Sequence, residues 1–302
     1  MSDSKKLIQF SNFYKKLNIF SFLLIIFSIL ILLFKGLNYG VDFKGGTLIE
    51  IRTNESVKIS DLRSAFINMN LGDVTVKKFG KKNDYLVKIE TINTKDDFIQ
   101  KINQKLSLII GSEVNFRRVE NVGPKVSNEL LKDGLLAISL SLAAMLFYIW
   151  IRFEWQFSLG AIIAIIHDVI ITLGIFSLLS YEINLSIVAA VLTIVGYSMN
   201  DTVVIFDRIR ENLKKYSKIS IIEISNISTN ETLSRTLITS VTTLLALSAI
   251  YFFGGAILKG FSFAMILGVF VGTYSSIFIA TPILNYTKVS QKTILKEDVE
   301  NN

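Results

Sequence analysis

Cysteine is absent from the 302 residues of the chain, and histidine occurs only once, as His167. The lack of cysteine excludes disulfides, thiol catalysis and cysteine-ligated metals, and the single histidine excludes a metal site with several histidine ligands. The G-x-S-x-G and H-E-x-x-H patterns of serine hydrolases and zinc proteases are also missing. We therefore predict no catalytic residues, no metal, no cofactor and no enzymatic activity.

Charge is also scarce: charged residues make up 19% of the chain, against 51% hydrophobic residues and a mean hydropathy of +0.49. This balance is too apolar for an ordinary soluble domain. The 32 lysines and arginines outnumber the 25 acidic residues, but many of them flank apolar runs. The net charge of +7 therefore indicates membrane topology, and we expect no binding of nucleic acid.

Six apolar runs have the length of about 20 residues that a helix needs to cross a bilayer. The first run lacks a convincing small-x-small cleavage site, so we expect a retained membrane anchor rather than a signal peptide. The predicted fold class is an α-helical membrane protein with six transmembrane helices, at about 17–36, 134–151, 157–179, 183–206, 236–257 and 261–284.

Basic residues in the flanks set the expected orientation, because lysine and arginine are enriched on the cytoplasmic side of a membrane. With six spans, residues 1–16, the link after 206 and the tail 286–302 fall on one side, which we predict to be cytoplasmic. Residues 37–124 then lie outside the cytoplasm. The basic residues that support this prediction are Lys5, Lys6, Lys15, Lys16, Arg208, Arg210, Lys214, Lys215, Lys218, Lys288, Lys292 and Lys296.

Segment 37–124 has the pattern of a small α+β domain. Runs rich in β-branched residues predict strands, and one-sided apolar residues predict helices, the first with Ser60 as its N-cap. The order βαββαβ predicts a ferredoxin-like fold. Such a domain serves either as a folded spacer or, as we favour, as a module that touches a partner or substrate. The predicted elements are strands 46–53, 73–80, 84–90 and 113–123, helices 59–70 and 94–107, and a hairpin turn at 80–83.

Asp201 lies within the fourth apolar run, where an isolated carboxylate is very unfavourable. It has to face a protein interior or a water path, pair with a cation, or stay neutral. Arg235, at the start of the fifth run, lies at a matching depth, so we expect these two side chains to pair. Two interpretations stay open: a carboxylate that changes its protonation in a proton relay, or a fixed ion pair that joins two helices.

Further polar residues within the apolar runs are candidates for a proton path or for helix packing. Asn200 and Thr202 flank Asp201, and Asn200 can hydrogen-bond across helices. His167 and Asp168 lie midway along the third run. Because helix neighbours point about 100° apart, we expect this pair not to face one partner together, with Asp168 toward the bundle interior. His167 is either a proton carrier or part of a hydrogen-bonded pair that joins helices.

Glycines and a proline mark the two ends of the α+β domain, as Gly45 and Gly46 before it and Gly123 and Pro124 after it. Glycine permits tight turns and close backbone approach, and proline should stop the last strand. We interpret these four positions as hinges or structural joints.

Two more stretches stand out in the membrane part. Small residues in 268–276 favour close packing of the sixth helix. The charged stretch 206–212 lies just beyond the membrane edge, where we interpret Glu211 and Asn212 as a solvated helix end and Asp207 and Arg208 as candidate anchors for the following loop.

Six motifs occur in order along nearly the whole chain. They are GLNYGVDFKGGTLIEI, VGPKVSNEL, IHDVIITLGIF, VGYSMNDTVVIFDRIREN, RTLITSVTTLLALSAIYFFGG and KGFSFAMILGVFVGTYSSIFIATPIL. The ordered set resembles the SecF side of the SecD/SecF family of bacterial protein-export proteins. Short pieces such as GGT are weak signals, whereas the fourth- and fifth-span motifs are specific. Ser127 and Ile238 depart from the family pattern, but neither touches a proposed proton group.

The resemblance implies half of an RND-type transporter fold, completed by the related subunit SecD. It implies an accessory of the SecYEG channel in the bacterial inner membrane, often with YajC, whose α+β domain is periplasmic. Such an accessory uses the proton-motive force to help draw an unfolded polypeptide across the membrane. On the family pattern Asp201 is the carboxylate tied to proton flow and Arg235 its basic partner. The alternatives are an RND-type exporter half for small molecules or lipids, and a scaffold without energy coupling, against which Asp201 argues.

Overall fold

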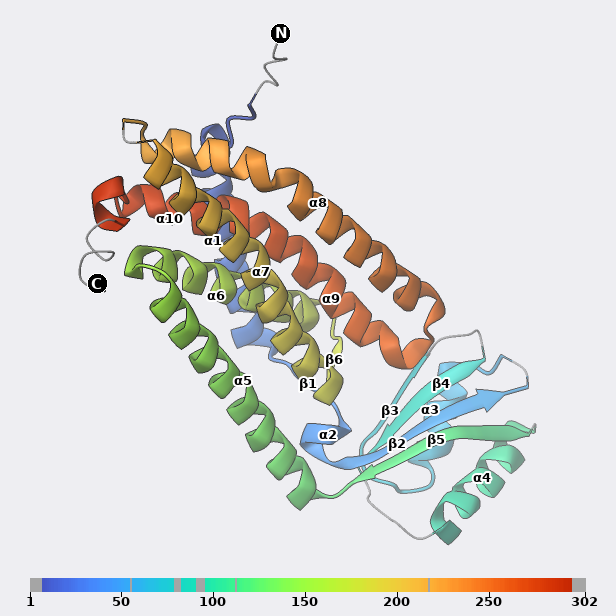
Figure 1. Ribbon diagram of the computed structural model, residues 1–302. Helices are drawn as coiled ribbons and strands as arrows, with labels where there is room; N and C mark the ends of the chain where they lie inside the picture. The colour runs from blue at the N-terminus through green and yellow to red at the C-terminus, as the bar shows by residue number, and fades with distance from the viewer. Residues whose placement is uncertain are drawn as a thin grey trace. The chain divides into compact units, whose positions relative to one another are not determined.

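The computed structural model describes residues 7–54, 56–78, 83–90, 96–111, 113–216 and 218–294. Lys5, Lys6, Lys296, most of the predicted hairpin turn and the first two residues of the predicted helix 94–107 lie outside these ranges. The chain divides into two compact units, drawn in Figure 1. The helical unit comprises residues 1–38, 137–181 and 186–302, and the α+β unit comprises residues 39–136 and 182–185.

Six helical stretches of the described chain are long and apolar enough to cross a membrane. Within such a helix every backbone hydrogen bond is satisfied locally, which is the requirement for spanning hydrocarbon. The last stretch changes from α-helix to a short π-helix and back. The elements are α1 (Ser11–Lys35), α5 (Pro124–Arg152), α6 (Trp155–Leu178), α7 (Leu185–Lys215), α8 (Ile221–Phe253), α9 (Ala256–Ser275), η1 (Ser276–Ala280) and α10 (Thr281–Tyr286).

Several helix ends differ from the predicted runs. At their polar ends most helices continue past the apolar residues, because backbone hydrogen bonding does not depend on hydropathy. The fifth span was predicted to reach residue 257, but α8 ends at Phe253, followed by Gly254 and by Gly255 with φ +80°. Glycine takes that conformation without steric cost, so the chain reverses there. The fourth span starts at Leu185 instead of Ile183, which belongs to a short strand.

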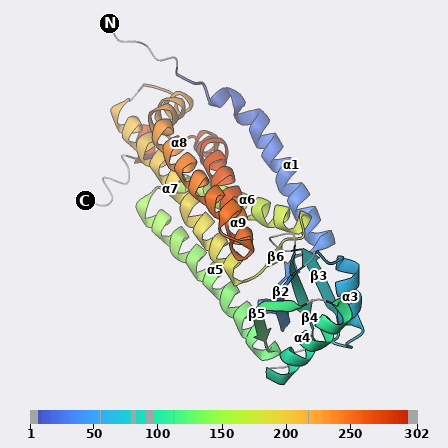
Figure 2. The same cartoon turned by 90° about the vertical axis from the view of Figure 1, so that its right-hand side faces the viewer.

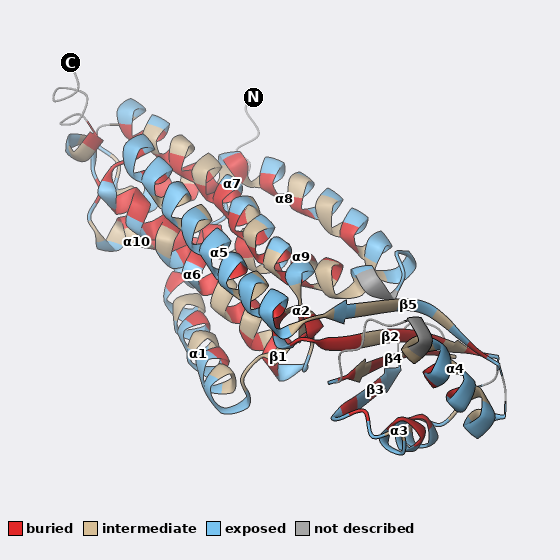
Figure 3. Ribbon diagram, turned by 90° about the horizontal axis from the view of Figure 1, so that it is seen from below, coloured by how far each residue is buried: buried red, intermediate tan, exposed pale blue. Residues whose placement is uncertain are grey.

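The inner and outer helices of the helical unit are clearly distinguished by burial (Figure 3). In the most apolar window of α6, 56% of the residues are buried, against 11% in α1 and in α5. Helices α7 and α9 are also half-buried in their windows, whereas α8 is mostly exposed. The interior of the unit is therefore built by α6, α7 and α9.

The N-terminal segment, the α7–α8 link and the C-terminal segment meet at one end of the helical unit (Figure 2). Ser11 N donates to Asn226 Oδ1 at 3.0 Å, and Gln291 Nε2 donates to Lys214 O at 3.4 Å. This grouping is the one that the basic residues predict. Part of the predicted tail is packed into the helical core, since Val289 and Ile294 are buried.

The α+β unit has a four-stranded antiparallel sheet in the order β3-β4-β2-β5. Helices α3 and α4 share one apolar core with the sheet, as the one-sided pattern of their sequences requires. The strand and helix order is the predicted βαββαβ. The elements are β1 (Asn38–Tyr39), α2 (Val41–Lys44), β2 (Gly46–Thr53), α3 (Ile59–Ile67), β3 (Val74–Lys78), β4 (Asp84–Ile89), α4 (Asp96–Ile110), β5 (Val114–Val122) and β6 (Glu182–Ile183).

Two details of the helices in this unit were predicted wrongly. The N-cap position of helix α3 is the extended residue Lys58, which makes no side-chain cap, and not Ser60, whose hydroxyl bonds to the neighbouring Asp61 side chain at 2.9 Å. Helix α4 runs past the predicted residue 107 to Ile110 and stops where Gly111 takes φ +71°.

The predicted joint at Gly45 and Gly46 is a place of close backbone approach. Gly45 has φ +76° and Gly46 φ +120°, and a Cβ on Gly46 would lie 2.6 Å from the carbonyl oxygen of Ile89. Only glycine fits there. On the other side of the domain, β5 ends at Val122 and α5 begins directly at Pro124, so the chain turns from strand to helix at Gly123.

Candidate functional site

The interior of the helical unit is polar where α6, α7 and the end of α9 meet. Close contact of α7 and α9 creates this site, because a Cβ on Gly272 would lie 2.9 Å from Ser198 Cβ. Small residues allow such an approach, as the 268–276 stretch predicts. Hydroxyl and carboxylate side chains from three helices then lie within hydrogen-bonding distance of each other.

Asp168 of α6 is 1% exposed and is held by three hydrogen bonds. Its Oδ2 accepts from Ser198 Oγ of α7 at 2.6 Å and from Ser275 Oγ of α9 at 2.8 Å. Its Oδ1 lies 2.8 Å from His167 Nδ1. Asp168 therefore faces the bundle interior, as predicted, and joins three helices through one side chain.

His167 lies beside Asp168 rather than turned away from it. The two side chains bond to each other, and both face α9: the His167 ring stacks on Tyr274 with centroids 6.0 Å apart, and Asp168 contacts Ser275. Each of the two nevertheless contacts different residues, His167 with Tyr274 and Asp168 with Ser275 and Ser198, as the 100° between neighbouring helix positions predicts. His167 Nε2 is buried and has no hydrogen-bond partner among the described residues.

Asp201 of α7 is 2% exposed but much less firmly bound. One hydroxyl, Thr273 Oγ1 of α9, donates to its Oδ2 at 3.4 Å. Thr273 in turn lies 2.7 Å from Ser240 Oγ of α8. The carboxylate is thus inside the unit, where the sequence requires it. It lies at the end of a short chain of hydrogen-bonded hydroxyls that runs from Ser240 of α8 through Thr273.

Arg235 does not form the predicted pair with Asp201 in this structure. Its side chain is exposed on α8, and the two groups lie beyond the 4.0 Å distance of an ion pair. The fixed ion pair is therefore not the arrangement found here.

The two neighbours of Asp201 differ in position. Thr202 is buried, and its Oγ1 lies 2.8 Å from Ser276 Oγ of η1. Asn200 is exposed on the outer side of α7 and makes no hydrogen bond within the described part of the chain. Thr202 belongs to the interior network, whereas Asn200 lies on the outer surface of the unit.

Residues 273–276 are functional candidates that the sequence predicted only as packing residues. Each of these four consecutive side chains contacts a different polar group, and the π-helix η1 begins at the last of them. Single π-turns are rare and often occur at functional sites. A signal was available in the sequence, since hydroxyls are concentrated here within an apolar run. The partners, in chain order, are Asp201, Ser21, Asp168 and Thr202.

Ion pairs cross-link the helices around the charged stretch 206–212. They join α7 to the end of α5, to the α5–α6 link and to α8, so this helix end is anchored rather than only solvated. Asp207 and Arg208 take part, as the sequence suggested. The pairs are Arg152–Asp207 at 3.0 Å, Glu154–Arg210 at 3.0 Å and Arg208–Glu231 at 2.6 Å.

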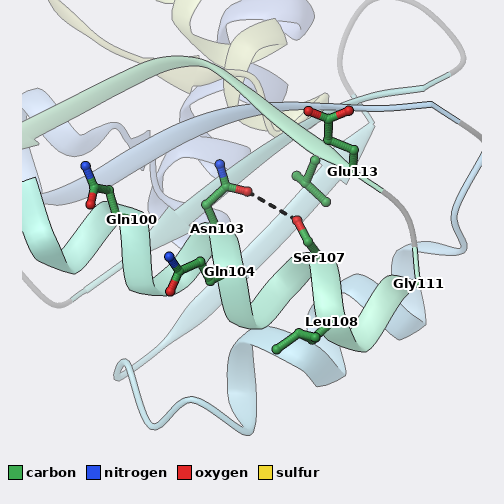
Figure 4. Close-up of a pocket in the computed structure, with 8 residues that line it drawn as sticks. Gln100, Asn103, Gln104, Ser107, Leu108, Gly111 and Glu113 are labelled. Atoms are coloured by element: carbon green, nitrogen blue, oxygen red, sulfur yellow. Dashed lines mark hydrogen bonds between the residues drawn. The ribbon is translucent and has the colours of Figure 1, made fainter.

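The α+β unit has an open polar depression beside α4 and the start of β5 (Figure 4). Ser107 Oγ donates to Asn103 Oδ1 within it at 3.3 Å, and Leu108 is 83% exposed. No three His, Cys, Asp or Glu side chains of the described ranges gather as metal ligands would. The depression is lined by Gln100, Asn103, Gln104, Ser107, Leu108, Gly111, Glu113 and Val114.

Two family models match the chain. The model described as "Protein export membrane protein SecD/SecF, C-terminal" covers residues 102–290, and the "SecD/SecF GG Motif" covers residues 30–57. The chain belongs to the SecD/SecF family. The motif resemblance is thereby confirmed, and the GG model includes the joint at Gly45 and Gly46.

Relatives and solved structures extend this SecD/SecF assignment over most of the chain. The protein translocase subunit SecF of Rickettsia bellii is 44% identical over 279 residues, which cover 91% of this chain and 92% of that protein. The SecF subunit of Vibrio alginolyticus is 43% identical over 302 residues, with 98% and 95% covered.

The crystal structure of SecDF from Thermus thermophilus, described as a translocon-associated membrane protein, matches 95% of this chain with a TM-score of 0.86 and 34% identity. A SecDF structure in a super-membrane-facing form matches 99% of this chain, with a TM-score of 0.70 and 32% identity. The chain spans 40% and 41% of these two SecDF chains. The predicted fold of six helices with an α+β domain after the first is confirmed, and the chain is a multi-pass membrane protein.

Proposed function

We propose that this chain is the SecF-type half of a proton-driven accessory to Sec protein export. Membership of the SecD/SecF family supports the export role. We place it in the bacterial inner membrane, with both termini in the cytoplasm and the α+β unit in the periplasm, because the basic residues gather at the end that holds both termini. We also propose that the chain catalyses no chemical reaction of its own.

The environment of Asp201 carries the proposal. A buried carboxylate whose one direct hydrogen bond is 3.4 Å long, with Ser240 as the next hydroxyl nearby and no ion pair, is not fixed in a single state by its surroundings. Approach of Arg235 would favour the charged form, and withdrawal would favour the neutral one. Proton binding and the helix arrangement then depend on each other.

The energy available to this coupling is limited. Moving one charge through the membrane potential supplies about 2.3 kcal/mol per 100 mV. That amount shifts a balance between two helix arrangements but is less than the roughly 5–15 kcal/mol that holds a domain folded. The accessory therefore biases or pulls a chain that is already unfolded.

Exposed polar side chains on the helical unit indicate that a partner subunit covers part of its surface. Asn200 of α7 and Arg235 of α8 both lie on its surface, and polar side chains facing lipid are costly. A SecD-type partner would cover them, which agrees with the 40% of a SecDF chain that this chain matches. Association with the SecYEG channel and with YajC is part of the same proposal.

Contact with the translocating polypeptide is assigned to the α+β unit. Strand β5 lies at the edge of the sheet and pairs only with β2 among the described strands. A free strand edge can add an extended peptide through backbone hydrogen bonds, without regard to its sequence. An unfolded export substrate meets that requirement.

Export of a secreted precursor into inverted vesicles tests the proposal. Vesicles with Asp201→Asn and the SecD-type partner should export without stimulation by a proton gradient, while assembly of the complex stays normal. The asparagine keeps the size of the side chain and removes its ability to bind and release a proton. Gradient-stimulated export that survives the change would refute the proton role of Asp201.

The alternative raised by the sequence is an RND-type exporter half for small molecules or lipids. Membership of the SecD/SecF family favours protein export over it. The same vesicles distinguish the two, since an exporter would move a small substrate with the gradient in the absence of any precursor protein.

A further inference from the structure

Helix α1 contacts the rest of the helical unit through a narrow polar seam. Its buried residues are Tyr14, Ser21 and Ser28, which are spaced seven apart and so lie on one stripe of the helix. Near one end of the seam, α6 approaches so closely that a Cβ on Gly174 would lie 2.6 Å from Ser28 Oγ. Most of the other α1 side chains are exposed, so a few contacts decide where α1 sits.

Tyr274 of α9 makes the central contact of this seam. Its hydroxyl donates to the carbonyl oxygen of Leu17 at 3.0 Å and lies 2.7 Å from Ser21 Oγ. The same ring stacks on His167, with centroids 6.0 Å apart and planes 28° from parallel. One side chain therefore touches both α1 and the buried His167–Asp168 pair.

The residues beside Tyr274 contact the two intramembrane acids. Thr273 donates to Asp201, and Ser275 donates to Asp168. Because these residues are consecutive and lead into the π-helix η1, a shift of the backbone that accompanies a change at Asp201 also moves Tyr274. Helix α1 in turn continues after Gly36 directly into β1 and the α+β unit.

We propose that Tyr274 is a positioning residue that passes changes at the intramembrane acids to α1. Its hydroxyl holds α1 to residues 273–276, the segment whose side chains bond to Asp201 and Asp168. Helix α1 in turn leads into the α+β unit. The inference rests on the proposed proton-driven function and specifies how proton binding reaches the domain outside the membrane.

Tyr274→Phe keeps the ring on His167 and removes only the hydroxyl that holds α1. In inverted vesicles with the SecD-type partner, gradient-stimulated export should fall at least about fivefold, because one lost hydrogen bond gives about that factor and the hydroxyl contacts both Leu17 O and Ser21 Oγ, while proton flux stays at the wild-type level. Ser21→Ala should act in the same direction but more weakly, and the double variant should be no worse than Tyr274→Phe, because Tyr274→Phe already removes the contact with Ser21. Tyr148→Phe, at a 55% exposed position of α5, is the matched control and should export normally.

Normal export by Tyr274→Phe overturns the proposal, and so does a parallel fall of export and proton flux, which would put Tyr274 in the proton step itself. Labelling of Ser28→Cys by a small maleimide gives a readout that does not depend on proton coupling, because the chain has no other cysteine. The Tyr274→Phe change should speed this labelling about fivefold as α1 loosens, and an unchanged rate overturns the proposal. Asp201→Asn vesicles that keep gradient-stimulated export would refute the proton-driven function while leaving the labelling result to stand on its own.

Discussion

Asp168 and Asp201 are both buried acids in membrane-spanning helices of one unit, yet their surroundings differ. Asp168 accepts hydrogen bonds from two serines at 2.6 and 2.8 Å and contacts His167 at 2.8 Å. Asp201 has one hydroxyl at 3.4 Å. Short hydrogen bonds to a carboxylate are strong and fix its position, so Asp168 is suited to join helices and Asp201 to change state. Burial alone does not separate a structural acid from a switching one, whereas the number and length of its hydrogen bonds do.

The largest difference between the two acids is expected in stability. Asp168→Ala leaves three buried groups without this acceptor and should lower the free energy of unfolding by about 3 kcal/mol. Asp201→Ala removes one long hydrogen bond and should change it by less than about 1 kcal/mol. Thermal unfolding of the purified protein in detergent measures both. Equal losses would mean that the hydrogen bonds seen here do not distinguish the two sites.

Most of the fold was predictable from the sequence, because the patterns that specify it are local. Apolar runs define the spanning helices, and the βαββαβ order defines the α+β unit. The errors lie where local sequence does not decide. Ser60 is a good N-cap residue in isolation, but the apolar face of α3 places the helix start at Ile59. The end of α8 depends on the Gly254–Gly255 turn, which hydropathy does not register.

The candidate site was predictable only in part. A carboxylate within an apolar run marks Asp201 from the sequence alone. Which groups surround it depends on how four helices pack, and no single run contains that information. The sequence thus predicted a contact with Arg235 that is not formed, and it missed Thr273 and Ser275, whose hydroxyls reach the two acids across helix boundaries.

Removing one hydroxyl donor from each acid tests the same difference between Asp168 and Asp201 with smaller expected effects on stability. Ser198→Ala removes a 2.6 Å bond to Asp168 and should lower the free energy of unfolding by about 1–2 kcal/mol. Thr273→Val keeps the shape of the side chain but removes both the 3.4 Å bond to Asp201 and the 2.7 Å bond to Ser240, and should cost no more than about 1 kcal/mol, most of it from the bond to Ser240. Unfolding midpoints of the two variants in one detergent give the comparison directly. If Thr273→Val is the more damaging change, Asp201 is held more firmly than the distances indicate.

The smallest expected effect concerns an acid outside the spanning helices, Glu182 of β6, which combines partial burial with an ion pair to Lys88. Lys88 Nζ lies 4.0 Å from its Oε1, and the two side chains are 23% and 26% exposed, respectively. Burial raises the pKa of Glu182 above its ordinary value of 4.5, and attraction to Lys88 opposes this only in part. Because the folded-state pKa exceeds the unfolded one, this carboxyl contributes stability that is fully present below pH 4.5 and is lost as pH rises through the folded value.

Glu182→Gln should therefore leave stability unchanged at about pH 4 and raise it at pH 7, by less than about 1 kcal/mol since the pair is partly solvated. Glu113→Gln makes the same chemical change at an exposed position of the same unit and is the matched control. Unfolding midpoints at both pH values decide the matter. A Glu182→Gln variant that is less stable than the wild type at pH 7 would mean that attraction to Lys88 outweighs burial. Glu182 would then resemble Asp168, whose partners hold it, rather than Asp201, whose surroundings leave it free to change.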